Sequence, residues 1–299
     1  MTTFIDNNEP RIKLLFVNDG IHHKNLQALQ RYDKIQIDTI HSPNDIIGMN
    51  LDKYDCVYSP GNPVNINLFP NTKFIFGPQF SVFPDEKIRG LARNNVAYII
   101  LSDWCKKLYE TFPITKGLRL EPIPFGVDTQ IFREVIPREK RFKVFIYHKF
   151  RNPYELQVLT TFLQVRGVDA TLFSYNQKYN EQDYIRQLQE SKFGIWFGCH
   201  ESQGFALQEA LSCNVPLLVW SVRSMSQEYG STYPYVPATT VSYWDERCGE
   251  YFHDPRELET TYNKFIENLP NYRPREFVLE NLSVEVCQNK FIDLIKNLE

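Results

Sequence analysis

The sequence lacks any long hydrophobic run. None of its 299 residues belongs to a stretch approaching the ~18 consecutive apolar residues of a membrane-spanning helix. The first residues, MTTFIDNNEPRIK, contain no apolar signal core. We therefore expect a soluble, cytoplasmic protein without a transmembrane segment, for which a peripheral membrane contact stays open.

The sequence also lacks paired cysteines. Its 6 cysteines are scattered, with no C-x-x-C pair and no paired histidine spacing. A disulfide framework or a zinc site normally needs such spacing, so we expect reduced thiols, no metal and no cofactor.

A charge excess of one sign is missing as well. The chain carries 33 Lys and Arg against 36 Asp and Glu, and neither half is strongly basic. This balance excludes the basic surface typical of proteins that bind a nucleic-acid polymer. The length predicts two domains of about 150 residues each.

Short apolar runs alternate with helical or polar stretches throughout the sequence. The first series has expected strands over 12–19, 56–61, 74–80, 97–103 and 118–132. After the charged, Pro-containing break REVIPREKR at 133–141, the second series has strands over 142–147 and 170–175 and helices over 154–166 and 181–190. This alternation favours an α/β fold with two doubly wound, parallel-sheet domains and a cleft between them.

We place the domains at 1–136 and 137–282. The remaining segment, 283–299, predicts an amphipathic helix that packs back toward the first domain. Ligands of such sheets bind outside the carboxyl ends of the strands.

The most informative segment is 191–220, SKFGIWFGCHESQGFALQEALSCNVPLLVW. It predicts a buried strand at 193–197, a polar turn with Glu201 and Gly204, a helix carrying Glu209, and a second strand. A glycine-bearing turn before a helix N-terminus favours anion binding, because free N–H groups and the helix dipole converge there. With a carboxylate on either side, this segment indicates recognition of a nucleoside diphosphate joined to a hydroxyl-rich group.

Further polar residues follow other predicted strands. Lys149 and Arg151 come directly after the strand at 142–147 and could neutralise a diphosphate; the sequence does not decide between them. Tyr175, at the end of another strand, could stack on a nucleobase.

The loop after the first strand supplies a second polar group. Gly20 allows close approach to a ligand, and Asn18, Asp19 and His22 could contact a sugar or an acceptor. The pair His22-His23 has no third partner that would indicate a metal site.

Two segments resemble retaining glycosyltransferases of the GT-B fold, the family 4-like group. HESQGFALQEALSCNVPLLV resembles the group's E-x7-E segment. IILSDWCKKLYE and PIPFGVDTQIF resemble a Ser-containing helix start and the I-P-x-G-V-D-x-x-x-F signature, so the match spans roughly residues 97–220. The resemblance implies transfer of a sugar from a UDP- or GDP-sugar to an acceptor hydroxyl of a glycan, without a metal.

The resemblance also implies roles for individual residues. Glu209 would bind the donor ribose, Glu201 would lie beside the transferred sugar, and Lys149 and Arg151 would bind the diphosphate. Backbone amides for the sugar and phosphates would come from Ser202, Gln203, Gly204, Phe205 and Ala206. Asp19-Gly20 replaces the family's double-glycine loop, and either Gln79 would take the place of a family histidine on the acceptor side or that contact is missing.

Other functions remain open at this stage. A non-catalytic protein of the same fold would bind nucleotide or glycan without turnover, and a nucleotide-sugar epimerase would form no new glycosidic bond. A hydrolase would use Glu201 and Glu209 as an acid–base pair facing each other across about 5–9.5 Å.

Overall fold

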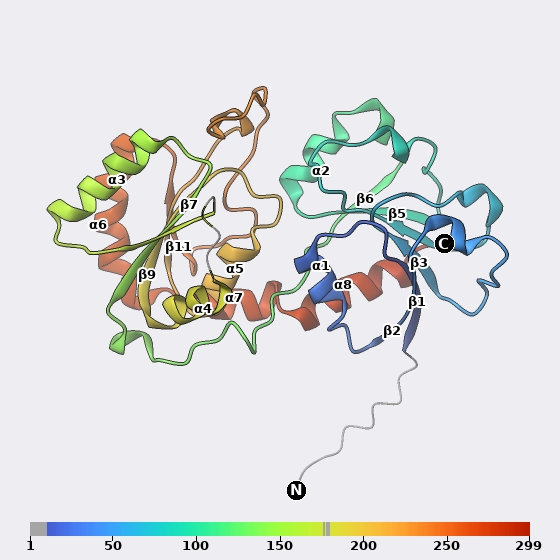
Figure 1. Cartoon of the computed structure of the whole chain (residues 1–299), viewed down its shortest axis with the longest axis horizontal. Coiled ribbons are helices and arrows are strands. Elements are labelled where there is room, and N and C mark those ends of the chain that lie inside the picture. Colours follow the sequence, from blue (N-terminus) through green and yellow to red (C-terminus); the bar gives the residue numbers. More distant parts are fainter. Residues whose placement is uncertain (1–10, 176, 178–179) are drawn as a thin grey trace, which may run out of the picture.

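The computed structural model describes residues 11–175, 177 and 180–299. They form two α/β domains that lie side by side (Figure 1). Residues 1–10, on which the expectation about a signal segment largely rests, lie outside the described residues. Within the described part of the chain, no helix has the length and apolar character needed to cross a membrane.

The first domain is built on a six-stranded parallel sheet in the order β2-β1-β3-β4-β5-β6. Its strands are β1 (Ile12–Val17), β2 (Ile35–Ile40), β3 (Cys56–Ser59), β4 (Phe74–Phe76), β5 (Val96–Ile100) and β6 (Arg119–Pro122). The central strands β3, β4 and β5 are buried along their whole length, as expected of strands covered on both faces.

The second domain has a five-stranded parallel sheet in the order β11-β10-β9-β7-β8. Its strands are β7 (Lys143–Lys149), β8 (Thr171–Ser174), β9 (Ser191–Gly198), β10 (Leu217–Trp220) and β11 (Gly249–Phe252). Strands β8 and β9 lie on opposite sides of β7, so the strand order reverses between β7 and β9. Doubly wound folds bind their ligands at such a point.

Helices cover both sheets. They are α1 (His23–Leu29), α2 (Asp103–Glu110), α3 (Pro153–Val165), α4 (Glu181–Glu190), α5 (Phe205–Ser212), α6 (Leu258–Asn268), α7 (Pro274–Asn281) and α8 (Val284–Lys296). α1, α3, α4 and α8 start at a side-chain cap, and α7 starts at a proline; in α3, for example, Asn152 accepts from Tyr154 N–H and Pro153 follows it.

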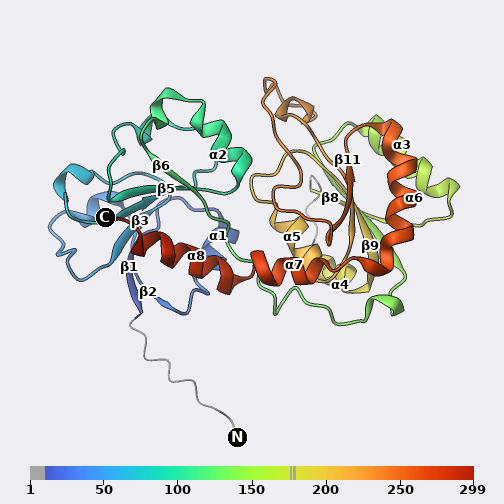
Figure 2. The ribbon, with the colours of Figure 1, turned by 180° about the vertical axis from the view of Figure 1, so that it is seen from behind.

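The last helix crosses from the second domain to the first. Figure 2 shows α7 over the second domain and α8 running across β1 and β3. Apolar residues of α8 and of the chain beyond it belong to the core of the first sheet: Phe291, Ile292, Leu294, Ile295 and Leu298. Both connections between the domains lie together, because Val127 N–H bonds to Leu282 C=O at 2.9 Å.

The fold class expected from the sequence is confirmed, whereas the exact domain bounds stay predictions. Two strands were not foreseen, β2 and β11. Both are edge strands with exposed polar or aromatic residues, so they lack the continuous apolar run that marks the central strands.

Candidate functional site

A cavity of about 450 Å³ lies between the domains at the carboxyl ends of the strands. The first domain lines it with residues 22–25, 27, 78–80 and 101. The second domain lines it with residues 147, 149, 175, 181, 184, 201–206 and 209. A larger and more open hollow of about 660 Å³ lies over residues 106–121 and contains none of the candidate site residues.

The N-terminus of α5 forms one wall of this interdomain cavity. Gly204 is the residue that precedes the helix, and its φ of 86° is a left-handed conformation that favours glycine. No side chain caps the helix, so no side-chain acceptor satisfies its first amides. The segment 202–206 lines the cavity, and its role as a source of backbone donors stays a prediction.

Glu201 and Lys149 form an ion pair across the point where the strand order reverses. Lys149 Nζ donates to both carboxylate oxygens of Glu201, at 2.9 and 3.0 Å. Burial lowers the pKa of Lys149, but the charge of Glu201 outweighs it and holds the pKa above its ordinary value. Lys149 is thus a fixed cation in the cavity wall.

Glu209 is paired with a lysine of the other domain. Lys24, in α1, donates to Glu209 Oε1 at 2.8 Å and to Glu181 Oε1 at 2.6 Å. Only 4% of Glu209 is exposed, and this burial raises its pKa to about 7, although Lys24 acts in the opposite direction. Sequence reasoning missed Lys24, which lines the cavity and links the two domains through these ion pairs.

Arg151 requires a correction. Its side chain is 1% exposed and does not line the cavity. The guanidinium donates to the carbonyls of Gly198 and Trp220, at 3.2 and 2.9 Å, and pairs with Glu155. These bonds join the ends of β9 and β10 to α3. Of the two expected diphosphate ligands, only Lys149 reaches the cavity.

The loop after β1 is only partly at the site. His22 lines the cavity, whereas Asn18, Asp19 and Gly20 do not. Asp19 Oδ2 instead accepts bonds from the backbone and side-chain nitrogens of Asn62, at 3.0 and 2.9 Å, so it fixes the neighbouring loop. The geometry therefore does not support the ligand contacts expected of Asn18, Asp19 and Gly20.

The other expected contacts, Gln79 and Tyr175, do line the cavity. Tyr175 is half exposed, and its ring lies 4.9 Å from Lys149 Nζ.

Burial, with help from nearby cations, lowers the pKa of His22 to about 4. The His22 imidazole is therefore neutral at physiological pH and can both donate and accept a hydrogen bond.

Gln203 lines the cavity, and its side chain has a structural role that the sequence did not predict. Its buried side chain pairs with the backbone of Phe125, accepting from N–H at 3.0 Å and donating to C=O at 2.6 Å. Phe125 belongs to the connection between the domains. Gln203 therefore attaches the turn that carries Glu201 to that connection.

We expect Gln203→Ala to destabilise the chain by about 2–4 kcal/mol, because it leaves a buried N–H and C=O of Phe125 unpaired. Urea unfolding followed by circular dichroism measures this difference. Gln164→Ala, on an exposed face of α3, is the matched control and should change stability by less than about 0.5 kcal/mol. Equal effects of the two substitutions would show that the Gln203–Phe125 pair contributes nothing.

The fold is similar to those of two solved structures. Sucrose-phosphate synthase from Thermosynechococcus elongatus aligns with a TM-score of 0.55 and 12% identity, over 96% of this chain and 99% of that chain. The N-terminal domain of trehalose-6-phosphate phosphatase from Candida albicans aligns with a TM-score of 0.56 and 12% identity, over 92% of this chain and 76% of that chain. No known family and no curated protein matches the sequence. At this identity the likeness establishes the fold alone, a GT-B arrangement of two Rossmann-like domains.

Proposed function

We propose that this chain is a retaining glycosyltransferase that moves a sugar from a UDP- or GDP-sugar to an acceptor hydroxyl of a glycan. One observation carries the proposal: Glu201 and Glu209 flank the uncapped N-terminus of α5 inside an interdomain cavity that also holds Lys149. The resemblance to the family 4-like group supports the same assignment of the two acids.

The cavity offers a distinct partner to each part of such a donor. The diphosphate would lie against the amides at 204–206 and the Lys149 ammonium, both of which favour negative charge. The ribose hydroxyls would bind Glu209, to whose Oε2 no described residue donates a hydrogen bond. The base would stack on Tyr175, at the cavity edge.

Charge stabilisation is the main catalytic contribution in this proposal. The bond between the sugar's anomeric carbon and the phosphate oxygen breaks, and negative charge develops on the departing diphosphate. Lys149 and the α5 N-terminus stabilise that charge most strongly in the transition state. The acceptor oxygen bonds to the anomeric carbon on the same face, and its proton passes to the leaving phosphate oxygen. No protein nucleophile or metal is required for this step.

The acceptor would approach from the first domain. His22 and Gln79 line that side of the cavity and supply neutral hydrogen-bonding groups. Neutral donors and acceptors suit sugar hydroxyls, which carry no charge. Closure of the two domains would also exclude water, which favours transfer over hydrolysis.

A thermal-shift screen of UDP, GDP, ADP and their common sugars tests the proposal. We expect one nucleotide to raise the melting temperature of the wild type, and its sugar to be consumed with release of the diphosphate. If no nucleotide stabilises the wild type at millimolar concentration, the donor site is wrongly assigned. Stabilisation without release of nucleoside diphosphate would instead support the non-catalytic alternative.

A further inference from the structure

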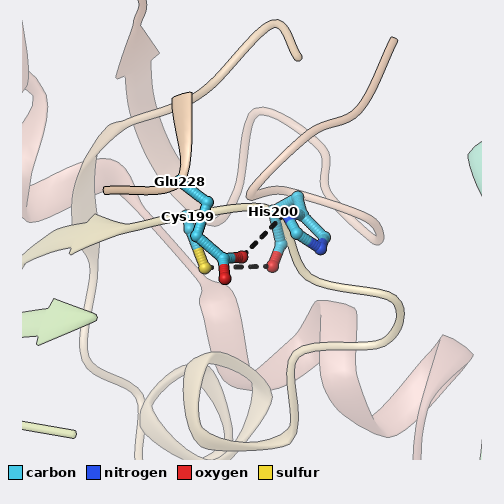
Figure 3. Close-up of side chains that lie close together, drawn as sticks. All are labelled: Cys199, His200 and Glu228. Carbon is cyan, nitrogen blue, oxygen red and sulfur yellow. Dashed lines mark hydrogen bonds and ion pairs between the residues drawn. The ribbon is translucent and has the colours of Figure 1, made fainter. Parts of the chain in front are cut away.

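Three potential metal ligands lie close together next to the turn that carries Glu201 (Figure 3). Cys199 and His200 directly follow β9, and Glu228 ends the 3₁₀ helix Met225–Gln227. One ligand atom from each residue lies within 4.8 Å of the other two. Figure 3 shows the Glu228 carboxylate beside both other residues; the dashed lines join it to the His200 ring and join the Cys199 thiol to the backbone carbonyl of His200, to which the thiol donates at 3.5 Å.

The polar groups of this cluster are incompletely satisfied by the protein. His200 Nδ1 is 3.4 Å from a Glu228 carboxylate oxygen, yet it is buried and makes no hydrogen bond of acceptable geometry. No lysine or arginine among the described residues forms an ion pair with Glu228, although its side chain is only 19% exposed. A carboxylate that is largely removed from solvent is stabilised by a cationic partner.

The surroundings fix the His200 ring. The indole of Trp104 lies edge-on at 5.9 Å between ring centres, and the ring of Tyr233 lies edge-on at 5.8 Å. Trp104 comes from α2 of the first domain, and Tyr233 comes from the segment after Glu228. The His200 ring is therefore held in place before any ligand binds, which reduces the cost of binding.

We propose that Cys199, His200 and Glu228 bind a divalent transition metal of the Zn²⁺ type. A set of one sulfur, one imidazole nitrogen and one carboxylate oxygen matches the ligands that Zn²⁺ takes in proteins, whereas Mg²⁺ and Ca²⁺ select oxygen alone. The metal supplies the positive charge missing beside Glu228 and a partner for His200 Nδ1. The Cys199 thiol loses its proton to solvent as the metal–sulfur bond forms.

The site would act as a brace for the turn rather than as part of the diphosphate site. Binding joins the end of β9 to the segment that contains Glu228, and Glu201 is the next residue after His200. The Glu201 carbonyl is already fixed by Trp104 Nε1 at 2.9 Å. This inference does not depend on the proposed transferase activity, because its ligands lie outside the residues that line the cavity.

Titration of the chelator-treated full chain with Co²⁺ tests the proposal directly. We expect one equivalent to bind, with the near-ultraviolet thiolate-to-cobalt absorption of a cysteine ligand, and Zn²⁺ to displace it. Cys199→Ser should abolish that absorption. Cys287→Ser, at a buried cysteine of α8, is the matched control and should retain it. A wild type without the absorption, or a Cys199→Ser variant that keeps it, overturns the proposal.

Glu228→Gln separates loss of a ligand from loss of folding. This substitution keeps the size of the side chain at a partly exposed position and should lower the affinity for Zn²⁺ at least tenfold while the far-ultraviolet circular dichroism is unchanged. Zn²⁺ should raise the melting temperature of the wild type and have a smaller effect on the variant. Equal shifts and equal affinities would show that Glu228 is not a ligand.

Discussion

Lys149→Met is expected to lower the turnover of the sugar nucleotide about 10²–10³-fold, the usual effect of removing one group that stabilises charge in a transition state. Lys149 is the cation that the structure places at the junction of Glu201 and the α5 N-terminus. Its charge matters most when the diphosphate departs, so turnover should fall more than the apparent affinity for the donor.

Release of nucleoside diphosphate measures this effect, with water or a mixture of glycans as the acceptor. Lys143→Met is the matched control, since Lys143 lies at the opposite end of β7, where it pairs with Glu190. The control should keep wild-type turnover. Loss of Lys149 also leaves Glu201 unpaired, so urea unfolding must confirm that the variant is folded. A folded Lys149→Met variant with turnover within threefold of the wild type would remove Lys149 from the mechanism.

Glu209→Gln is expected to weaken nucleoside diphosphate binding about 10–100-fold, because a hydrogen bond to a charged acceptor contributes roughly 1.5–3 kcal/mol. Gln retains the shape but lacks the charge, and it also leaves Lys24 without its buried partner. Isothermal titration calorimetry measures the loss. Glu181→Gln is the control, because it removes the other carboxylate that pairs with Lys24 while Glu209 remains. Unchanged affinity in Glu209→Gln would place the ribose elsewhere.

The pH dependence of binding provides a separate test of Glu209. Burial raises its pKa to about 7, so the carboxylate becomes protonated below that pH and is then a poorer acceptor for ribose hydroxyls. Affinity should therefore fall as the pH drops through 7, and Glu209→Gln should abolish this dependence. Lys24→Met should move the midpoint upward, because Lys24 lowers the pKa of Glu209. A midpoint that Lys24→Met leaves in place would contradict the role of the ion pair.

The contribution of Glu209 to the free energy of unfolding depends on pH in the opposite direction from its contribution to ligand binding. Since the pKa of Glu209 is higher in the folded chain than its ordinary value of 4.5, the folded state binds more protons between these two pH values. The contribution of Glu209 to stability is therefore complete at acidic pH and declines as the pH rises through 7. Comparing the unfolding free energies of the wild type and Glu209→Gln across this range isolates that contribution.

Local sequence patterns were sufficient to predict the strand, turn and helix around Glu201. The buried run of β9, the glycine at 204 and the periodicity of α5 all act within about twenty residues, so propensity and burial determine them without distant partners. The same holds for the alternation that predicted two parallel sheets.

Contacts between distant segments could not be predicted in this way. Lys24 meets Glu209 only because α1 of one domain faces α5 of the other, and no pattern in either helix encodes that apposition. The prediction that Arg151 reaches the cavity was wrong for a different reason. Phe150 has a φ of 47°, and beyond this residue the Arg151 side chain lies buried between the ends of β9 and β10 rather than in the cavity. Lys149 and Arg151 are only two residues apart in the sequence, yet Lys149 lines the cavity and Arg151 is a buried structural residue.

The course of α8 has a consequence for the order in which the chain acquires its structure during synthesis. The first sheet is complete once residue 122 has been made, but five apolar side chains between residues 291 and 298 fill one of its faces. That face stays exposed to solvent until the entire second domain has left the ribosome. The domain that is translated first is consequently the last to become fully packed, and a chain interrupted before residue 284 would present an uncovered apolar surface to chaperones and proteases.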